Sequence, residues 1–120
     1  MARIDLEGVQ HSYGNVEALE KFDLTWNDGG RYAILGPSGC GKTTMLNIMS
    51  GIIKPTQGRI LFDGNDITNL QTADRNIAQV FQFPVIYGTM RVWDNLAFPL
   101  VCRNVPTDQI KTKVEEVANT

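Results

Sequence analysis

Alternating apolar and polar residues predict two half-buried strands near the start of the chain. In ARIDLEGV, Ile4 and Leu6 alternate with charged neighbours, and the same alternation runs through LEKFDLTW. Side chains of a strand point alternately to its two faces, so each segment has one apolar face. The turn sequence NDGG at 27–30 follows, and glycine and asparagine tolerate the positive φ angles of tight reversals. We therefore expect antiparallel strands in this region.

A continuous apolar run, RYAIL at 31–35, predicts a strand buried on both faces, as in a parallel sheet. A glycine-rich loop follows, and then a helix is expected from about Lys42 to Ser50. The apolar residues at helical spacings of three and four are Leu46, Met49 and Ile53. Gly51 is placed to end this helix. The predicted order is strand, loop, helix.

The remaining segments predict two strands and two helices. RILFDG forms a strand with Ile60 and Phe62 on one face, and NIAQVF at 76–81 forms another. Prolines and glycine divide the chain beyond them, which leaves a short helix around 92–98 and a second helix from Thr107, its expected N-cap. The residues expected to share one face of the second helix are Ile110, Val114 and Val117.

Composition limits the possible functions. At 120 residues and 13.3 kDa, with 42% hydrophobic residues, the chain is at most one globular domain. A net charge of −2 with scattered basic residues argues against nucleic acid as a partner. No segment approaches the roughly 20 apolar residues of a membrane helix, so we expect a cytosolic protein. Cys40 and Cys102 lack the spacing of a disulfide framework or a zinc site.

The sequence GPSGCGKTT at 36–44 carries the clearest chemical signal. It contains the motif GxxxxGK[ST] from Gly36 to Thr43, in which glycines let the backbone curl until several N–H groups point at one phosphate chain. A helix that begins near Lys42 adds the positive end of its dipole. In a chain of this composition a chance match has a probability of about four in a thousand. We therefore predict a phosphate-binding loop.

The side chains of this loop have separate expected roles. Lys42 reaches the β and γ phosphates, Thr43 offers its hydroxyl to Mg²⁺, and Thr44 bonds a more inner phosphate. The residues expected to surround the nucleotide are Gly36, Pro37, Ser38, Gly39, Cys40, Gly41, Lys42, Thr43 and Thr44. The side chain of Cys40 is incidental to a backbone cradle, although a thiol beside Lys42 at a helix start could be alkylated easily.

The chain resembles the ATP-binding cassette (ABC) ATPases over essentially its whole length. The matching segments, in the order of the family, are HSYGN, GPSGCGKTT, IIKPTQGRILFDGNDIT and DRNIAQVFQFPVIYGTMRVWDNLAFPL. The resemblance implies an α/β P-loop NTPase fold with an N-terminal antiparallel β subdomain, truncated before the signature and Walker B motifs. The implied parts are 1–35 for the β subdomain and P-loop strand, 36–51 for the P-loop and helix, 52–82 for the strands to the Q-loop, and 83–120 for the start of the helical subdomain.

The resemblance also implies roles for two residues outside the loop. An aromatic residue upstream of the glycine loop stacks on adenine in this family, and Tyr13 holds that position; packing at a strand end is the alternative. Gln82 in VFQ matches the Q-loop glutamine, which ligates Mg²⁺ and orients water. The alternative is that Gln82 is simply a polar residue at the end of a strand, a description that fits Gln79 equally. Lys42 and Gln82 are thus the catalytic candidates, and Thr43 and Gln82 the metal ligands.

The implied cofactors are ATP and Mg²⁺, and the implied partners are a second ATPase subunit and transmembrane permease subunits, with the protein on the inner face of the cell membrane. The segment after Pro84 matches the part of the family that meets the permease; local core packing is the alternative for its apolar residues. These segments are most similar to importers of carbohydrates, glycerol or glycerol phosphate. Gly88 and Arg91 depart from that subfamily's usual residues.

Other readings stay open because the 120 residues contain no LSGGQ signature, no Walker B strand and no switch histidine, since His11 precedes the loop. We expect hydrolysis from a complete protein and none from this chain alone. A truncated, non-catalytic nucleotide-binding or partner-docking module is the alternative. A GTPase is less favoured, because TKVE at 112–115 is the nearest approach to its guanine-reading motif. A small-molecule kinase would not account for VFQFP.

Overall fold

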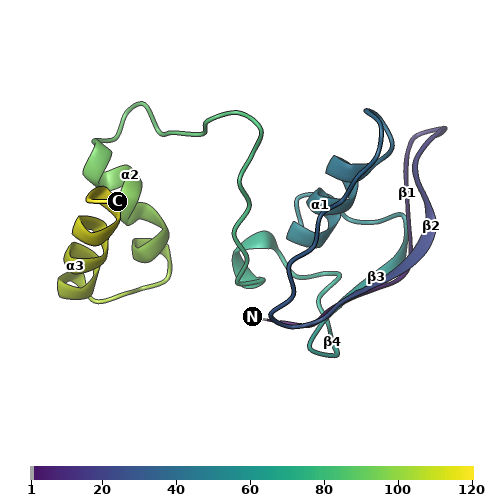
Figure 1. Cartoon of the computed structure of the whole chain (residues 1–120), viewed down its shortest axis with the longest axis horizontal. Coiled ribbons are helices and arrows are strands. Elements are labelled where there is room, and N and C mark those ends of the chain that lie inside the picture. The colour runs from purple at the N-terminus through teal and green to yellow at the C-terminus, as the bar shows by residue number, and fades with distance from the viewer. Residues whose placement is uncertain (1) are drawn as a thin grey trace. The chain divides into compact units, whose positions relative to one another are not determined.

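The computed structural model of the protein describes residues 2–120. The chain forms two compact units, Met1–Gln79 and Val80–Thr120, and each is described by itself (Figure 1). Within residues 2–120, no helix combines the length and the apolar character that crossing a bilayer requires.

The first unit is built on an antiparallel sheet. Its strands are β1 (Ile4–Tyr13), β2 (Val16–Trp26), β3 (Gln57–Phe62) and β4 (Asn65–Asp66), in the spatial order β2-β1-β3-β4. Leu6 of β1 lies opposite Leu24 of β2 on one side and Ile60 of β3 on the other. Apolar positions of neighbouring strands are thereby paired across the sheet. The two antiparallel strands predicted near the N-terminus are confirmed.

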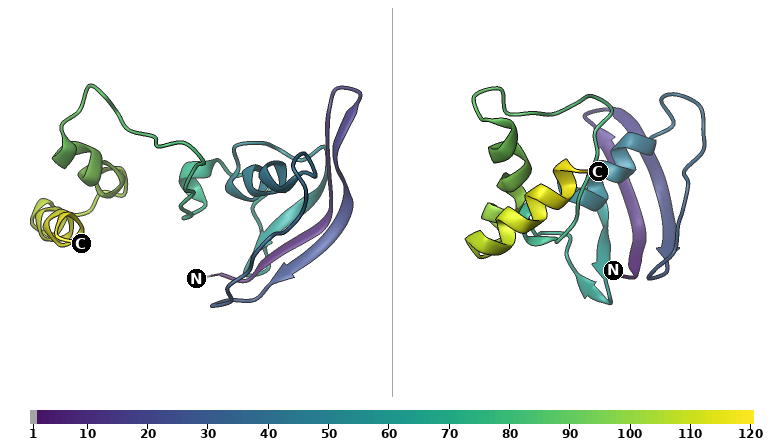
Figure 2. Two further views of the ribbon diagram at one scale, coloured as in Figure 1. Left: turned by 45° about the horizontal axis from the view of Figure 1, so that its top comes forward. Right: turned by 60° about the vertical axis from the view of Figure 1, so that its left-hand side comes forward.

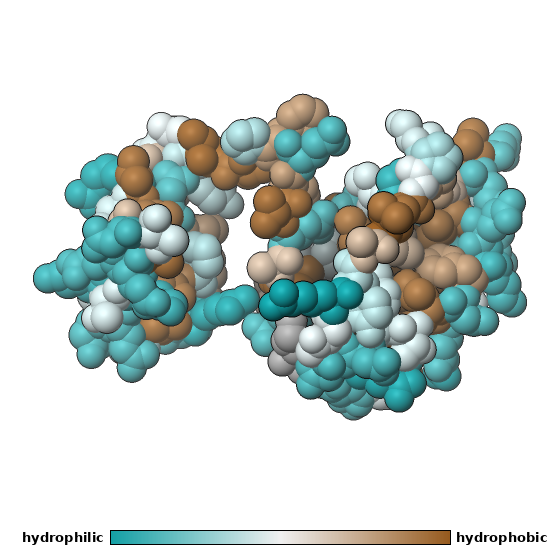
Figure 3. All heavy atoms as spheres, in the orientation of Figure 1, coloured by the Kyte–Doolittle hydropathy of each residue, from teal (hydrophilic) through white to brown (hydrophobic). Residues whose placement is uncertain are grey.

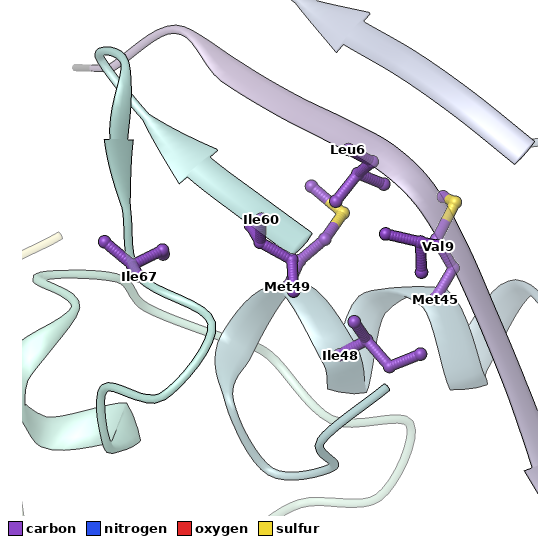
Figure 4. Close-up of a cluster of buried hydrophobic side chains, with 7 residues drawn as sticks. All are labelled: Leu6, Val9, Met45, Ile48, Met49, Ile60 and Ile67. Carbon is purple, nitrogen blue, oxygen red and sulfur yellow. The ribbon is translucent and has the colours of Figure 1, made fainter. Parts of the chain in front are cut away.

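Helix α1 (Lys42–Ser50) lies against one face of this sheet (Figure 2). The buried side chains that join helix and sheet are Leu6, Val9, Met45, Ile48, Met49, Ile60 and Ile67 (Figure 4). Val9, Ile48 and Ile60 have no exposed surface. Burial of an aliphatic side chain contributes about 1.5–3 kcal/mol. The interface between α1 and the sheet is therefore the hydrophobic core of the first unit.

The predicted bounds of α1 are confirmed, but its buried face differs from the prediction. Gly51 ends the helix with a φ of +85°, and its N–H donates to the carbonyl of Ile48 at 3.2 Å. Met49 is buried as expected, whereas Leu46 is 41% exposed. Met45 and Ile48 occupy the inward positions instead. Several apolar faces fit a helix this short, and the sheet selects one of them.

Two predicted strands are wrong. Residues 31–35 and 76–81 have no strand structure, and Leu35 and Val80 are 90% and 97% exposed. A parallel strand exists only where a neighbouring strand offers carbonyl and N–H partners. Among the described residues, all strand pairs are antiparallel and none includes these two segments. Their apolar composition marks a strong tendency to form strands, but pairing decides whether the strands form.

The segment after β2 turns back on itself. The turn expected at 27–30 is confirmed, because the N–H of Gly30 donates to the carbonyl of Asn27 at 3.1 Å. The hydroxyl of Tyr32 then accepts a hydrogen bond from the N–H of Asn27 at 2.9 Å, and its ring stacks on Trp26 with centroids 5.3 Å apart. These contacts hold the start of the RYAIL segment against the end of β2. The segment does not form a strand of its own.

The second unit consists of two packed helices, α2 (Val92–Cys102) and α3 (Thr107–Ala118). Their shared core contains Ala97, Ile110 and Val114, with Leu96, Leu100 and Val105 packed around it. The predicted buried face of α3 is confirmed at Ile110 and Val114, whereas Val117 is exposed. The short connection between them keeps the two helices packed against each other.

The ends of these helices differ from the prediction. Helix α2 continues through Pro99, although a proline in a helix interior loses one hydrogen bond and crowds the preceding turn. The packing of Ala97 and Leu100 against α3 opposes that cost. Thr107 is the first helical residue of α3, and the N-cap is Pro106, which forms no side-chain cap. The expected Thr107 cap is therefore wrong.

The core of the first unit allows a matched test on one helix. We expect Ile48→Ala to lower the free energy of unfolding by about 2–5 kcal/mol, because it removes a fully buried side chain and leaves a cavity. Leu46→Ala lies two residues away on the exposed face, so we expect a loss below about 1 kcal/mol. Urea denaturation followed by circular dichroism measures both. Equal losses would contradict the described face of α1.

Candidate functional site

The glycine loop at 36–44 is held against strand β2. A side chain on Gly41 would place its Cβ 2.7 Å from the carbonyl oxygen of Ala18 and 3.0 Å from Leu19, and the φ of Gly41 is +91°. Only glycine permits this close approach of two backbones together with a left-handed conformation. The end of the loop is thus fixed on the sheet immediately before α1 begins.

The start of the loop closes onto its own end. A Cβ on Gly36 would lie 2.6 Å from the sulfur of Cys40, so a side chain at position 36 would displace Cys40 from its place. Gly39 has a φ of +82° and faces open space. One glycine therefore allows close packing, while the other provides a left-handed turn. Together they give the curled backbone that the motif predicted.

The ammonium group of Lys42 lies within this curl. Its Nζ donates to the carbonyls of Gly36 and Pro37, both at 2.6 Å, and lies 3.4 Å from the sulfur of Cys40. These carbonyl acceptors are neutral, so they satisfy the hydrogen-bond donors without neutralising the charge. A phosphate oxygen is a stronger partner, because hydrogen bonds between ionised groups are roughly twice as strong as neutral ones.

The N-terminus of α1 is open to an anion. No side chain caps it, and its first turn contains no acidic residue. The N–H groups of the first turn have no partner within a helix, and the first intrahelical bond runs from Met45 to the carbonyl of Gly41 at 2.9 Å. Thr43 is exposed and Thr44 is half-buried at this end. The donors, the helix dipole and the free lysine charge all favour a polyanion such as a triphosphate.

Tyr13 lies at the end of β1, opposite Val16 of β2. It is 50% exposed, and its ring meets His11 edge-on with centroids 4.6 Å apart. The loop contacts β2 at Ala18, two residues beyond Val16, which corresponds to about 7 Å along a strand. The structure thus places Tyr13 in the same unit as the loop, on the adjacent part of the hairpin, with part of its ring free for contact.

The two glutamines differ in their surroundings. Gln82 is exposed and belongs to the second unit, so its predicted role as a magnesium ligand stays a prediction. Gln79 belongs to the first unit, where its amide Nε2 donates to Oδ1 of Asn47 on α1 at 3.0 Å. The oxygen Oε1 of Gln79 is buried and has no hydrogen-bond partner among the described residues. Gln79 is therefore hydrogen-bonded to α1, the helix that follows the glycine loop. The sequence alone did not predict this contact.

Sequence reasoning also missed Arg75, a buried arginine in the first unit. Its guanidinium donates to backbone carbonyls at the C-terminal end of α1 and in the segment after β4. In the sequence it stands in ADRN, a polar context that resembles an ordinary surface turn. Two of its acceptors, the carbonyls of Ile48 and Met49, lie 27 and 26 residues earlier in the chain, so no local pattern could have identified the contact with α1.

Exposed apolar residues occupy the segment before α2 and the first turn of this helix in the second unit. They are Phe83, Val85, Ile86, Tyr87, Val92 and Trp93. Apolar surface of this kind is visible in the space-filling view (Figure 3). Tyr87 has local packing as well, because its ring meets that of Phe98 edge-on with centroids 5.1 Å apart. A contiguous exposed apolar segment is typical of a surface that binds another protein.

This segment has a defined local structure. The side chain of Asn95 accepts a hydrogen bond from the N–H of Tyr87 at 2.8 Å and donates to the carbonyls of Tyr87, Met90 and Arg91 at 3.0–3.2 Å. Arg91 also pairs with Asp94 at 2.7 Å. Its hydrogen bond lowers the pKa of Asp94, and the carboxylate raises the pKa of Arg91. The loop before α2 is thus held by side chains of α2 itself.

Comparison with known proteins agrees with this geometry. A family described as ABC transporter matches residues 19–120. A spermidine/putrescine import ATP-binding protein of Haemophilus influenzae is 42% identical over 94% of the chain, and an sn-glycerol-3-phosphate import ATP-binding protein of Bordetella pertussis is 40% identical over 98% of it. The chain spans 30% and 33% of the lengths of these relatives.

The chain is also similar to a solved structure. A nucleotide-free ATP-binding cassette from an ABC transporter is 29% identical, with a TM-score of 0.74 over 92% of this chain and 45% of that structure. The family match covers most of the chain, including the whole glycine loop. Members of this family are ATP-hydrolysing enzymes. The chain therefore belongs to the ABC transporter ATPases, as a part of their ATP-binding cassette.

Proposed function

We propose that this chain binds ATP at residues 36–44 and that, in the complete protein, hydrolysis of this ATP drives an importer. The observation that carries the proposal is the open N-terminus of α1, beside a Lys42 ammonium whose hydrogen bonds go to two carbonyls and the Cys40 sulfur of its own loop. This arrangement holds uncompensated positive charge and free N–H donors at one place. A polyphosphate satisfies both.

The residues of the loop contact different parts of the nucleotide. Backbone N–H groups of the curl and of the first turn of α1 bind phosphate oxygens. Lys42 exchanges the carbonyls of Gly36 and Pro37 for oxygens of the β and γ phosphates. Thr44 bonds a more inner phosphate, and the Thr43 hydroxyl is a ligand for Mg²⁺. The bound metal supplies neutralisation of charge that develops on the phosphates.

Two residues outside the loop complete the proposed site. Tyr13 stacks its exposed ring on adenine, and Gln82 contributes an amide oxygen to Mg²⁺ and orients the attacking water. Lys42 and Gln82 are then the catalytic groups that this chain supplies. A general base for water is not among the assigned residues, so we expect the chain alone to bind ATP without hydrolysing it. On that account it is a nucleotide-binding module by itself and an ATPase within a complete protein.

The relatives support import as the function of the complete protein. Their names include import of spermidine and putrescine, which are cations, and of sn-glycerol 3-phosphate, which is an anion. We propose a small polar solute such as a sugar, glycerol or glycerol phosphate as the cargo, recognised by other chains. The exposed apolar segment at 83–93 binds a transmembrane permease subunit, and a second ATPase subunit completes the nucleotide site. The protein then lies at the cytoplasmic face of the cell membrane.

The charge of Lys42 is tested by comparison with another lysine. We expect Lys42→Ala to weaken the binding of ATP about tenfold or more, because a charge-assisted hydrogen bond contributes about 1.5–3 kcal/mol. Lys54→Ala removes the same charge from an exposed position of the same unit and should change affinity less than about twofold. Competition titrations with a fluorescent ATP analogue measure both. Equal affinities for Lys42→Ala and wild type would contradict the site.

Cys40 and Cys102 provide an internal comparison for the position of the nucleotide. Both thiols are exposed, but only Cys40 lies in the loop. Saturating Mg²⁺–ATP should slow the alkylation of Cys40 about tenfold or more by occupying the curl, and should leave Cys102 unchanged. Mass spectrometry of peptides after timed exposure to N-ethylmaleimide gives both rates. Unchanged alkylation of Cys40 would place ATP elsewhere.

The adenine contact of Tyr13 is tested with a ligand that has no base. We expect Tyr13→Ala to weaken ATP binding about fivefold or more, since stacking of a base on an aromatic ring contributes about 1–3 kcal/mol. Tyr13→Phe should retain the affinity. Inorganic tripolyphosphate should bind Tyr13→Ala and wild type equally in calorimetric titrations. An equal loss for both ligands would show that Tyr13 supports the loop and does not stack on adenine.

A further inference from the structure

Arg75 is a buried cation that the proposed chemistry does not use. Only 5% of its surface is exposed. Its Nε donates to the carbonyl of Leu70 at 2.9 Å, and Nη2 donates to the carbonyl of Thr68 at 3.1 Å. Its Nη1 donates to the carbonyls of Ile48 and Met49 at 3.0 and 3.1 Å. The guanidinium thus joins the C-terminal end of α1 to the segment that follows β4.

The end of α1 provides a reason why a charge is tolerated here. Burying an unpaired cation is costly, and burial lowers the pKa of Arg75. The carbonyls of Ile48 and Met49 are among the last of the helix and form the negative end of its dipole, and that of Ile48 also accepts the N–H of Gly51. The cation therefore donates to two carbonyls that carry this negative partial charge. Gly51 makes room for it, since a Cβ there would lie 2.7 Å from Nε of Arg75.

A second contact attaches the same segment to the helix. Gln79 follows Arg75 by four residues and donates to the side chain of Asn47, one residue before Ile48. Residues 75–79 are therefore bound to α1 at both of their ends, and Gln82 comes three residues later in the chain. The predicted phosphate ligands lie at the opposite end of the same nine-residue helix. A helix of this length spans about 13 Å and moves as one rigid element.

We propose that Arg75 is a positioning residue of the nucleotide site, which fixes the C-terminal end of α1 to the segment that leads into Gln82. This inference rests on the proposed function of the loop. Arg75 touches neither phosphate nor metal; it sets where the loop helix and the chain before Gln82 lie relative to each other. Only a planar fork of several N–H donors reaches carbonyls on both sides, so lysine replaces it incompletely.

The test compares two variants of Arg75 with one control in the complete ATPase that contains this chain. Arg75→Met keeps the apolar bulk and removes all the hydrogen bonds. Arg75→Lys keeps the charge and loses the fork. Arg59→Met is the control, because Arg59 is exposed on β3 of the same unit and pairs with the exposed Glu7. The readouts are the KM for ATP, the turnover per nucleotide-occupied site, and the midpoint of thermal unfolding.

We expect Arg75→Met to lower the turnover per occupied site about tenfold or more with KM changed less than about threefold, because a small displacement of a catalytic group is costly while the loop itself stays closed. The turnover per occupied site of Arg75→Lys should lie between those of Arg75→Met and wild type. That of Arg59→Met should equal the wild-type value. If Arg75→Met does not fold, Arg75→Lys decides alone. Wild-type turnover per occupied site in Arg75→Lys, at any loss of stability, would overturn the inference.

The proposed function is tested separately, by the hydrolysis of ATP in the wild-type protein and in Lys42→Ala. A wild-type protein that hydrolyses ATP, and a Lys42→Ala variant that does not, support that function whatever the Arg75 variants do. A wild-type protein that neither binds nor hydrolyses ATP overturns the proposed function and with it the role of Arg75. A protein that hydrolyses ATP with wild-type turnover in both Arg75 variants overturns only the role of Arg75.

Discussion

The packing of α1 on the sheet is the contact on which the rest of the first unit depends. Ile48 has no exposed surface and belongs to the same buried cluster as Val9 and Ile60. This contact fixes the direction of the helix, and the direction determines what each end can do. At one end Gly41 brings the loop against Ala18 of β2. At the other end the last carbonyls of the helix point to Arg75.

The two ends of α1 carry partial charges of opposite sign from the helix dipole. The N-terminus has no cap and no acidic residue, so its positive end is available to an anion. The C-terminus carries negative partial charge, which Arg75 satisfies from within the protein. One end of the helix is thus satisfied by the fold, and the other end is available to a charged ligand. The loop lysine adds a full charge where the open end needs it.

Sequence patterns identified the local features well and the non-local ones poorly. The glycine loop, the bounds of α1 and the antiparallel strands follow from residue spacing, because short-range sterics and alternation determine them. The strands expected at 31–35 and 76–81 failed because a buried strand depends on a partner strand, which a composition of apolar residues does not supply. The inward face of α1 and the role of Arg75 depend on contacts with distant segments. The roles of Tyr13 and Gln82 stay predictions.

The most direct test of the central claim is an amide NMR titration of the ¹⁵N-labelled chain with Mg²⁺–ATP. The account predicts that the amide signals of Gly39, Gly41 and Lys42 shift together and saturate with one dissociation constant, because their N–H groups exchange solvent for phosphate. The signals of Gly64, in the turn between β3 and β4, and of Gly88, before α2, should stay in place. Shifts that leave the loop unchanged, or no shifts at millimolar ATP, would contradict the account.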